Sequence, residues 1–256
     1  MTRPPQPRSS GGDQGLHRPE PGRAGLEAVL ARVADVPGWM SDAQAGVLWD
    51  EAAAVPAGGR VVEIGSHLGR SACVLASALP TGARLSAVDP FGADWRYGLP
   101  DTRVRCEQNL RAAGVRDRVD LVVATSREAF TAHPRGEQVD LVYVDGKHDA
   151  LSLVLDVRWA RHLPEGGVLL VHDAFSSLGV TTGLLLRVLG SRRLRYVDRT
   201  GSLARFVVAR PTAADRARML AQLGWFARNL VVKVLLRLRL RRVAALLGHH
   251  GEADPF

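Results

Sequence analysis

Residues 61–76, which read VVEIGSHLGRSACVLA, constrain the fold more than any other segment of the chain. A short apolar run ends at Ile64, a turn containing Gly65 and Gly69 follows, and apolar residues then recur at helical spacing from Ala72 onward. This order predicts a strand, a glycine turn and a helix. In that arrangement the backbone of the turn can approach a nucleotide-like ligand closely.

The spacing of the two glycines argues against two common phosphate-binding loops. The dinucleotide fingerprint requires G-x-G-x-x-G and the phosphate loop requires G-x-x-x-x-G-K-[ST]. This turn reads E-x-G-x-x-x-G-x-S and has no lysine at the required place. Because Glu63 lies directly before the turn, it would repel a phosphate. The turn instead favours a ligand with a cationic amino-acid end, such as S-adenosylmethionine.

Strands and helices alternate from residue 60 to residue 209. Apolar runs predict strands at 60–64, 84–88, 119–123, 139–144 and 168–171, with helices at 69–79, 102–113, from Arg127, at 149–162 and at 178–189. A turn between 194–199 and 203–209 is typical of a β-hairpin. We therefore expect an α/β fold: a Rossmann-like, doubly wound, seven-stranded and mostly parallel sheet that ends in an antiparallel hairpin. Two helices, from Leu26 and up to about Ala54, should precede it.

Composition divides the chain into three parts. Residues 1–25 are rich in Pro, Gly, Ser and Arg and are expected to form a disordered tail. Residues 26–211 form the predicted domain, and residues 212–256 form a basic C-terminal helical extension. The net charge of +8 comes mostly from residues 212–247, which hold eight basic residues and one acid. The two cysteines cannot build a disulfide framework, and Cys73 is expected in the core.

The basic extension has three interpretations. It packs on the domain or on a partner subunit in a homo-oligomer, it lies in the plane of a membrane surface, or it contacts nucleic acid. Nucleic acid is the least expected partner, because no aromatic platform accompanies the arginines. The stretch 236–241 alternates like a strand. The N-terminus does not resemble a signal peptide, so we expect a cytoplasmic protein, peripheral at the membrane if the second interpretation holds.

Polar residues follow the predicted strands at their carboxyl ends, where open α/β sheets bind ligands. Asp89 lies about twenty residues beyond the glycine turn, the spacing that places a carboxylate on ribose hydroxyls, although Asp-Pro is also a turn former. Ser126 either bonds an adenine edge or caps the helix that starts at Arg127.

Two further groups carry the candidate chemistry. Asp145 and His148 flank a turn at Gly146, and His148 has the near-neutral pKa of a general base. His172 and Asp173 end the fifth strand. The structural alternatives are a helix N-terminus at His148 and a hydrogen-bonded cap at His172 and Asp173. The sharper interpretation is a pocket that holds a divalent ion.

Together these motifs resemble the class I S-adenosylmethionine-dependent methyltransferases, and within them the bacterial small-molecule subgroup similar to cephalosporin and macrolide-sugar O-methyltransferases. The resemblance covers about residues 36–210. It rests on VVEIGSHLGRS, AVDPF and DLVYVDGKHDALSLVLDVRWARHLPEGGVLLVHDAF.

The resemblance implies roles for single residues. It places a cofactor site at Glu63, Gly65, Ser66, Gly69, Ser71, Asp89, Ser126 and Asp145. It implies ligands for Mg²⁺ or another divalent cation at Asp145, His172 and Asp173, and catalytic roles for His148, Asp173 and His172. The sequence departs from the catechol-type relatives, because His172 replaces a carboxylate ligand and His148 replaces the catalytic lysine. Lys147 is expected to point elsewhere on its turn.

The sequence thus predicts an S-adenosylmethionine-dependent methyltransferase that acts on a hydroxyl of a small molecule, a sugar or a secondary metabolite. A second hypothesis is a noncatalytic cofactor-binding or membrane-associated partner protein that retains the fold. A third, a dehydrogenase, lacks its G-x-G-x-x-G motif. The loop 90–101, with Trp95, Arg96 and Tyr97, is expected either to cover the adenosine and acceptor sites or to be a plain surface loop.

Overall fold

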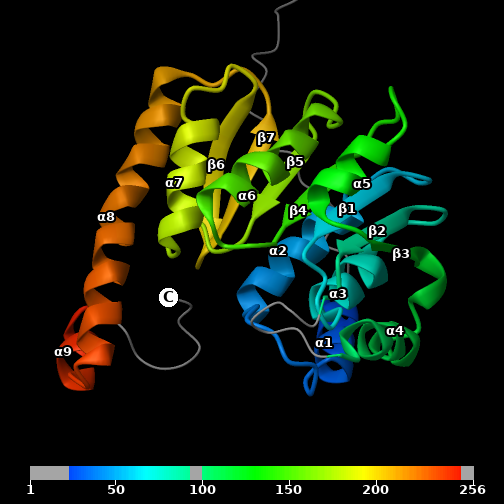
Figure 1. Cartoon of the computed structure of the whole chain (residues 1–256), viewed down its shortest axis with the longest axis horizontal. Helices are drawn as coiled ribbons and strands as arrows, with labels where there is room; N and C mark the ends of the chain where they lie inside the picture. Colours follow the sequence, from blue (N-terminus) through cyan, green and yellow to red (C-terminus); the bar gives the residue numbers. More distant parts are fainter. Residues whose placement is uncertain (1–22, 93–99, 249–256) are drawn as a thin grey trace, which may run out of the picture.

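A seven-stranded sheet with the strand order β3-β2-β1-β4-β5-β7-β6 runs through the centre of the molecule (Figure 1). The computed structural model describes residues 23–92 and 100–248. The strands are β1 Arg60–Ile64, β2 Arg84–Asp89, β3 Val119–Val123, β4 Leu141–Val144, β5 Val168–Val171, β6 Leu194–Thr200 and β7 Leu203–Val208. The first five strands are parallel, and β7 runs antiparallel to both β5 and β6. The predicted fold class is confirmed.

The order of the strands reverses between β1 and β4. The chain leaves β1 toward β2 on one side, while β4 and β5 extend the sheet on the other. In the register of this central pair Val62 lies opposite Val142, and Glu63 lies opposite Tyr143. Both faces of these strands are buried, which explains their continuous apolar sequences. The loops at their carboxyl ends diverge and leave room for a ligand.

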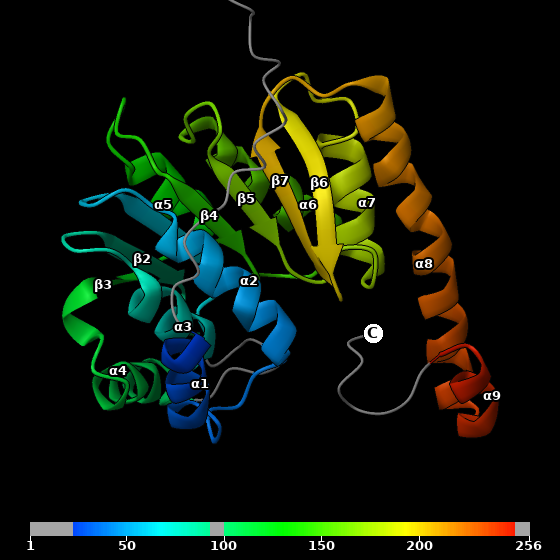
Figure 2. The same ribbon diagram turned by 180° about the vertical axis from the view of Figure 1, so that it is seen from behind.

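Helices cover both faces of the sheet. They are α1 Arg23–Arg32, α2 Asp42–Ala53, α3 Arg70–Ala78, α4 Thr102–Ala112, α5 Ser126–Ala132, α6 Ala150–Asp156, α7 Leu178–Arg187, α8 Ala213–Arg237 and α9 Arg241–Leu246, with short 3₁₀ helices η1 Arg116–Arg118 and η2 Val157–Arg161. The first three cover one face and α5, α6 and α7 the other (Figures 1 and 2). One core forms around Leu48 and Leu75, and the second around Leu153 and Phe175.

The N-terminal helices differ slightly from their prediction. Ser41 caps α2 in a capping box with Gln44. However, α1 begins at Arg23 instead of Leu26, so it includes three residues that the sequence assigned to a tail. A Cβ on Gly25 would lie 2.9 Å from the Trp49 ring, so this glycine lets α1 approach α2 closely. Residues 1–22 of the predicted tail lie outside the described residues.

Two internal boundaries also differ. The fourth strand begins at Leu141 instead of residue 139. Just before it, the backbone N–H of Asp140 donates to the Arg60 carbonyl, and the Asp140 carboxylate accepts from the Arg60 N–H. The helix predicted over 149–162 divides into α6 and the 3₁₀ helix η2. The side chain of Asp149 caps α6 by accepting from the N–H of Ser152, as its position before the helix favours.

The C-terminal extension is helical, as predicted. Helix α8 runs beside β6 and continues past the sheet, and α9 folds back beside its end (Figure 2). The strand-like alternation at 236–241 forms no strand. Instead α8 ends at Arg237, Arg239 adopts a left-handed φ of 60°, and α9 begins at Arg241. Local hydrogen bonds such as that from the Leu240 N–H to the Leu235 carbonyl therefore prevail over the strand-like alternation.

Candidate active site

The glycine turn after β1 brings two strand ends together. Gly65 has a φ of 91°, and a Cβ at this position would clash with the backbone of Asp145 at the end of β4. Gly69 has a φ of 82° and precedes α3, with Cys106 packed against it. Both positions need glycine because other residues rarely adopt this conformation. The turn therefore lies directly against the loop that follows β4.

Glu63 lies behind this turn. Its carboxylate is fully buried and accepts hydrogen bonds from Ser66 Oγ (2.7 Å) and Ser71 Oγ (2.5 Å). Burial raises the pKa of Glu63 to about 7, although the two serine hydroxyls oppose this change. The carboxyl group thus ties the start of α3 to β1. Glu63, Ser66, Gly69 and Ser71 do not line the cavity described below, so their predicted contacts with a cofactor stay predictions.

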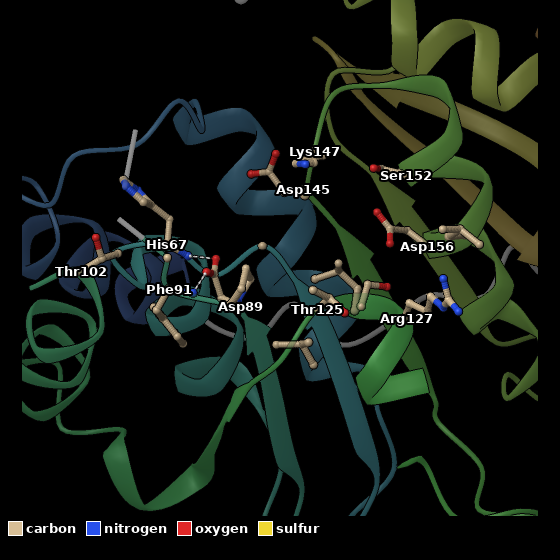
Figure 3. A pocket seen from close by; sticks show the side chains of 18 residues that line it. His67, Asp89, Phe91, Thr102, Thr125, Arg127, Asp145, Lys147, Ser152 and Asp156 are labelled. Carbon is tan, nitrogen blue, oxygen red and sulfur yellow. Dashed lines mark hydrogen bonds between the residues drawn. The ribbon is translucent and has the colours of Figure 1, made fainter. Parts of the chain in front are cut away.

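Asp89 ends β2 and holds two strained residues. Its carboxylate accepts from the backbone N–H of His67 (2.9 Å) and of Phe91 (2.6 Å), as Figure 3 shows. Both of these residues have positive φ, 44° and 49°. Two backbone donors use part of the carboxylate's acceptor capacity and leave lone pairs for a ligand. Asp89 lines the cavity, and its predicted contact with a ribose stays a prediction.

A cavity of about 490 Å³ opens where β1 and β4 diverge. Its size is that of a typical cofactor or small-molecule site. Four of the predicted cofactor residues line it: Gly65, Asp89, Ser126 and Asp145. The remaining lining residues were not predicted as site residues and are Ile64, His67, Val88, Pro90, Phe91, Gly92, Thr102, Thr125, Arg127, Gly146, Lys147, Ser152, Leu155 and Asp156.

Ser126 does not cap the helix that follows β3. Thr125 is the N-cap of α5 and forms a capping box with Glu128, so the cap lies one residue earlier than the alternative at Ser126 predicted. Ser126 Oγ instead accepts from Trp159 Nε1 (3.2 Å) and bonds Asp156. Burial raises the pKa of Asp156 to about 6, against the effect of this bond. An acid within the apolar face of α6 was the signal that could have indicated this residue.

Lys147 corrects a second expectation. Its side chain was expected to point away from the site, but Lys147 lines the cavity next to Asp145 (Figure 3). Asp145 and Lys147 lie at the same mouth of the cavity because the tight turn at Gly146 lets both reach it. A cation and a carboxylate at one mouth can recognise the two ends of a zwitterionic amino-acid group.

Three polar side chains meet beside the cavity mouth. His148 Nδ1 lies 3.2 Å from Asp173 Oδ2, and His148 Nε2 lies 3.9 Å from Asp145 Oδ1. One potential ligand atom from each of these residues lies within 4.8 Å of the others. The His148 side chain is 45% exposed, whereas that of Asp173 is 17% exposed. An incoming molecule can therefore reach the imidazole, while the acids lie on its inner side.

His172 has a different place from the other members of the predicted catalytic set. Its side chain is only 3% exposed, with Nδ1 3.2 Å from Asp145 Oδ1 and Nε2 3.4 Å from Gln44 Oε1. Gln44, fully buried on α2, also donates to Ser202 and was not predicted. His172 is therefore a support for Asp145 beneath the cluster. The three residues whose potential ligand atoms lie close together are Asp145, His148 and Asp173, so His148 and not His172 is the histidine of this group.

The carboxylates and histidines shift each other's protonation. Burial favours a neutral Asp145, but His172 and His148 outweigh it and hold the pKa of Asp145 well below its usual range. The Asp145 and Asp173 carboxylates raise the pKa of His148 against partial burial. Burial disfavours a charged His172, yet the same two acids raise its pKa. The cluster is thus a network of paired charges.

The loop that carries Asp173 is strained and anchored from outside the domain. Asp173 and Phe175 have φ values of 54° and 57°. Asn229 Nδ2 of α8 donates to the Phe175 carbonyl (3.3 Å), and Lys233 Nζ donates to the Ser176 carbonyl (2.8 Å). These contacts could not be predicted from local sequence patterns, because they join residues more than fifty positions apart. Trp95, Arg96 and Tyr97 lie outside the described residues.

Comparison with known proteins agrees with this geometry. Residues 62–174 match a family model described as a methyltransferase domain. The fold is similar to that of the O-methyltransferase TomG from Streptomyces achromogenes, involved in tomaymycin synthesis and solved with SAM (20% identity, TM-score 0.55, 73% of this chain and 91% of that chain). An O-methyltransferase from Bacillus cereus, solved with SAH, is also similar (20% identity, TM-score 0.53, 74% and 93%).

A further similar structure is cofactor-bound Rv0187 from MTB, with 25% identity, a TM-score of 0.56 and coverage of 73% of this chain and 90% of that chain. The chain therefore contains a methyltransferase domain, and its fold is that of solved S-adenosylmethionine-dependent methyltransferases. In this methyltransferase the matched segment begins within β1 and ends just after Asp173. It therefore includes the glycine turn, the cavity and the Asp145–His148–Asp173 cluster.

Proposed function

We propose that this methyltransferase transfers a methyl group from S-adenosylmethionine to a hydroxyl oxygen of a small molecule, a sugar or a secondary metabolite. The observation that carries the proposal is the partly exposed imidazole of His148, held by Asp173 beside the mouth of the cavity. Transfer to oxygen requires removal of a hydroxyl proton, and this histidine is placed for that task. The names of the similar O-methyltransferases support the same reaction class.

The cavity fits the cofactor in size and in the order of its polar groups. Asp89 would bond the ribose hydroxyls, and Ser126 and Asp156 would face the adenine. Gly65 leaves room for the ligand at the switch point, and Asp145 and Lys147 would bind the ammonium and carboxylate of the methionine end. When bound, S-adenosylmethionine supplies an electrophilic methyl group. The protein holds the acceptor oxygen in line with that methyl group and excludes water.

His148 would accept the proton of the acceptor hydroxyl. Asp173 Oδ2, 3.2 Å from Nδ1, fixes the orientation of the ring and favours the imidazolium that forms. This leaves Nε2 as the nitrogen that faces an acceptor, and Asp145 at 3.9 Å is the nearest acid to it. His172, beneath Asp145, would hold that carboxylate in place.

A divalent ion such as Mg²⁺ is a second element of the proposal. Asp145, Asp173 and His148 offer two carboxylates, which suit Mg²⁺, and one imidazole, which suits a divalent transition metal better. His172 is the more buried alternative ligand. An ion held there would supply positive charge that lowers the pKa of an acceptor hydroxyl. If the ion used His148 as a ligand, the same imidazole could not accept a proton, so the two roles compete.

Substitution of His148 tests the proposal. We expect His148→Ala to reduce turnover by at least about a hundredfold, the usual contribution of a general base. Affinity for S-adenosylmethionine, measured by calorimetric titration, should stay unchanged. Gln108→Ala, which changes an exposed amide on α4 that does not line the cavity, is the control and should leave both quantities near the wild-type values. Near wild-type turnover of His148→Ala would remove the proposed base.

Two further measurements separate the alternatives. Assay in excess EDTA should leave activity intact if His148 alone accepts the proton, and should abolish it if the ion is essential. Titration with S-adenosylmethionine, S-adenosylhomocysteine and NAD distinguishes the methyltransferase from another adenosine-cofactor enzyme. Binding of S-adenosylmethionine without turnover of any hydroxyl acceptor would favour a noncatalytic partner protein.

A further inference from the structure

Helix α8 is fixed to the domain along one face. Met219 and Val232 are buried, and Asn229 and Lys233 donate to the loop after Asp173. The Arg199 guanidinium also lies 3.8 Å from the centre of the Trp225 ring. These contacts extend over several turns of the helix. They fix which side of α8 faces away from the molecule.

The opposite face of α8 is an exposed apolar stripe. It consists of Leu220, Gly224, Ala227, Val231, Val234 and Leu238, which follow one another at intervals of three and four residues. Residues at this spacing share one face of a helix. No member of the stripe is charged, and Val234 and Leu238 are 56% and 62% exposed. At 1.5 Å per residue the stripe is about 27 Å long.

The end of the arm adds positive charge to this stripe. Residues 237–247 contain Arg237, Arg239, Arg241 and Arg242, all exposed, between the exposed side chains of Leu240, Val243 and Leu246. No acidic residue occurs from 216 to 248. Within the described part of the chain, none of the ion pairs uses these four arginines. Apolar and cationic groups are therefore presented together.

Of the helices in the described residues, α8 alone has the length and apolar composition to cross a bilayer. Its contacts oppose that arrangement, because spanning would remove Asn229 and Lys233 from the carbonyls that they bond. Lying in the interface keeps these bonds and buries the outer stripe. Arginines beside such a stripe reach the headgroups.

The positive charge of the arm indicates which kind of partner covers its exposed apolar stripe. Another copy of the chain would bring a second set of arginines and a domain, residues 26–211, whose charges nearly balance. An anionic lipid surface offers dense negative charge and an apolar layer at the same depth, which matches both features of the arm.

We propose that the arm, α8 and α9, docks the methyltransferase on anionic membrane surfaces with its apolar stripe in the interface. The anchored face of α8 is connected to the cavity mouth by the loop after β5. Asn229 of α8 bonds this loop at Phe175, and Asp173 of the same loop contacts His148 beside the mouth. Docking would therefore hold the active site near the membrane surface, where amphipathic acceptors collect.

Vesicle flotation of the full-length protein tests this proposal. We expect flotation with vesicles of equal parts phosphatidylglycerol and phosphatidylcholine, and none with phosphatidylcholine alone. Binding should weaken as salt increases. The double variant R241Q/R242Q should bind about thirtyfold more weakly, because each basic residue contributes about 1 kcal/mol at an anionic surface. Val234→Asp should also release the protein.

Matched controls separate the arm from general effects of charge. The double variant R103Q/R135Q removes two exposed arginines from α4 and from the loop after α5. Val104→Asp changes a valine with the same 56% exposure as Val234. Both controls should float like wild type. The proposal is overturned if wild type ignores the anionic vesicles, or if arm and control variants lose binding equally. A third outcome also overturns it: the wild-type protein is a dimer that does not bind vesicles, and Val234→Asp converts this dimer to monomers. In that case a second copy of the chain covers the apolar stripe.

Discussion

At the scale of single residues, the buried carboxyl group of Glu63 is the most informative. Among the described residues the hydroxyls of Ser66 and Ser71 donate hydrogen bonds to it, and the charges of Asp145 and Asp89 add to the effect of burial on its pKa. An unfolded glutamate has its ordinary pKa near 4.5, whereas the folded protein raises this pKa to about 7. Folding therefore favours the protonated form, and the group costs stability once it ionises.

Glu63→Gln should remove this pH dependence. Between pH 4.5 and 7 the folded state binds more protons at Glu63 than the unfolded state, so the free energy of unfolding falls as the pH rises. The fall amounts to about 3 kcal/mol, since one pKa unit corresponds to about 1.4 kcal/mol. Glutamine keeps the shape without ionising. Urea denaturation at pH 5 and pH 8, without cofactor, should show wild type losing stability relative to the variant. A constant difference between them at both pH values contradicts the assignment.

The residue scale is also where sequence reasoning reached its limit. Asp89 and Asp145 were predictable as cavity residues because each follows a buried strand at a known edge of the sheet. The expected direction of Lys147 was wrong, and so was the alternative that Ser126 caps a helix, because a one-residue shift in a turn or a cap reverses the direction of a side chain. Asp156 was not foreseen, because a single acid within an apolar helix has no period to reveal its partner.

At the scale of elements, the periodicity of apolar residues predicted the strands and helices of the domain well. Parallel strands that are buried on both faces give unbroken apolar runs, and these leave little choice of register. The predicted C-terminal end of the α-helix at 149–162 was wrong, because the 3₁₀ helix η2 replaces its last turns. The docking of α8 on the Asp173 loop was also beyond prediction, since it depends on tertiary hydrogen bonds between distant residues.

Asn229→Ala tests the role of that docking. Asn229 is 1% exposed, and its loss would leave the buried Phe175 carbonyl without this donor. We expect a loss of roughly 1–3 kcal/mol in the free energy of unfolding, the cost of an unsatisfied buried polar group. Turnover should fall as well, with unchanged affinity for S-adenosylmethionine, because the loop places Asp173. Gln108→Ala, an exposed amide on α4, should change stability by less than about 0.5 kcal/mol. Equal effects of the two substitutions count against a positioning role.

At the scale of the whole molecule, the cavity joins the two halves of the sheet. Its lining comes from the ends of β1 and β2 on one side and from β4 and α6 on the other, as Figure 3 shows. The two cores lie on opposite faces of the same sheet, so both halves share one framework. A ligand that bridges them should therefore stabilise the entire domain and not one loop only.

This linkage gives a quantitative expectation for the cofactor. S-adenosylmethionine at a hundred times its dissociation constant for wild type, a concentration kept the same for every variant, should raise the free energy of unfolding of wild type by about 2.7 kcal/mol, because it binds the folded state alone. Urea denaturation with and without ligand measures this shift. His148→Ala should show the same shift, since His148 lies beside the cavity mouth and is absent from its lining. Asp89→Asn, which alters the lining, should show a smaller one. A larger shift with NAD than with S-adenosylmethionine would assign the crevice between β1 and β4 to a different nucleotide, whatever the domain's family.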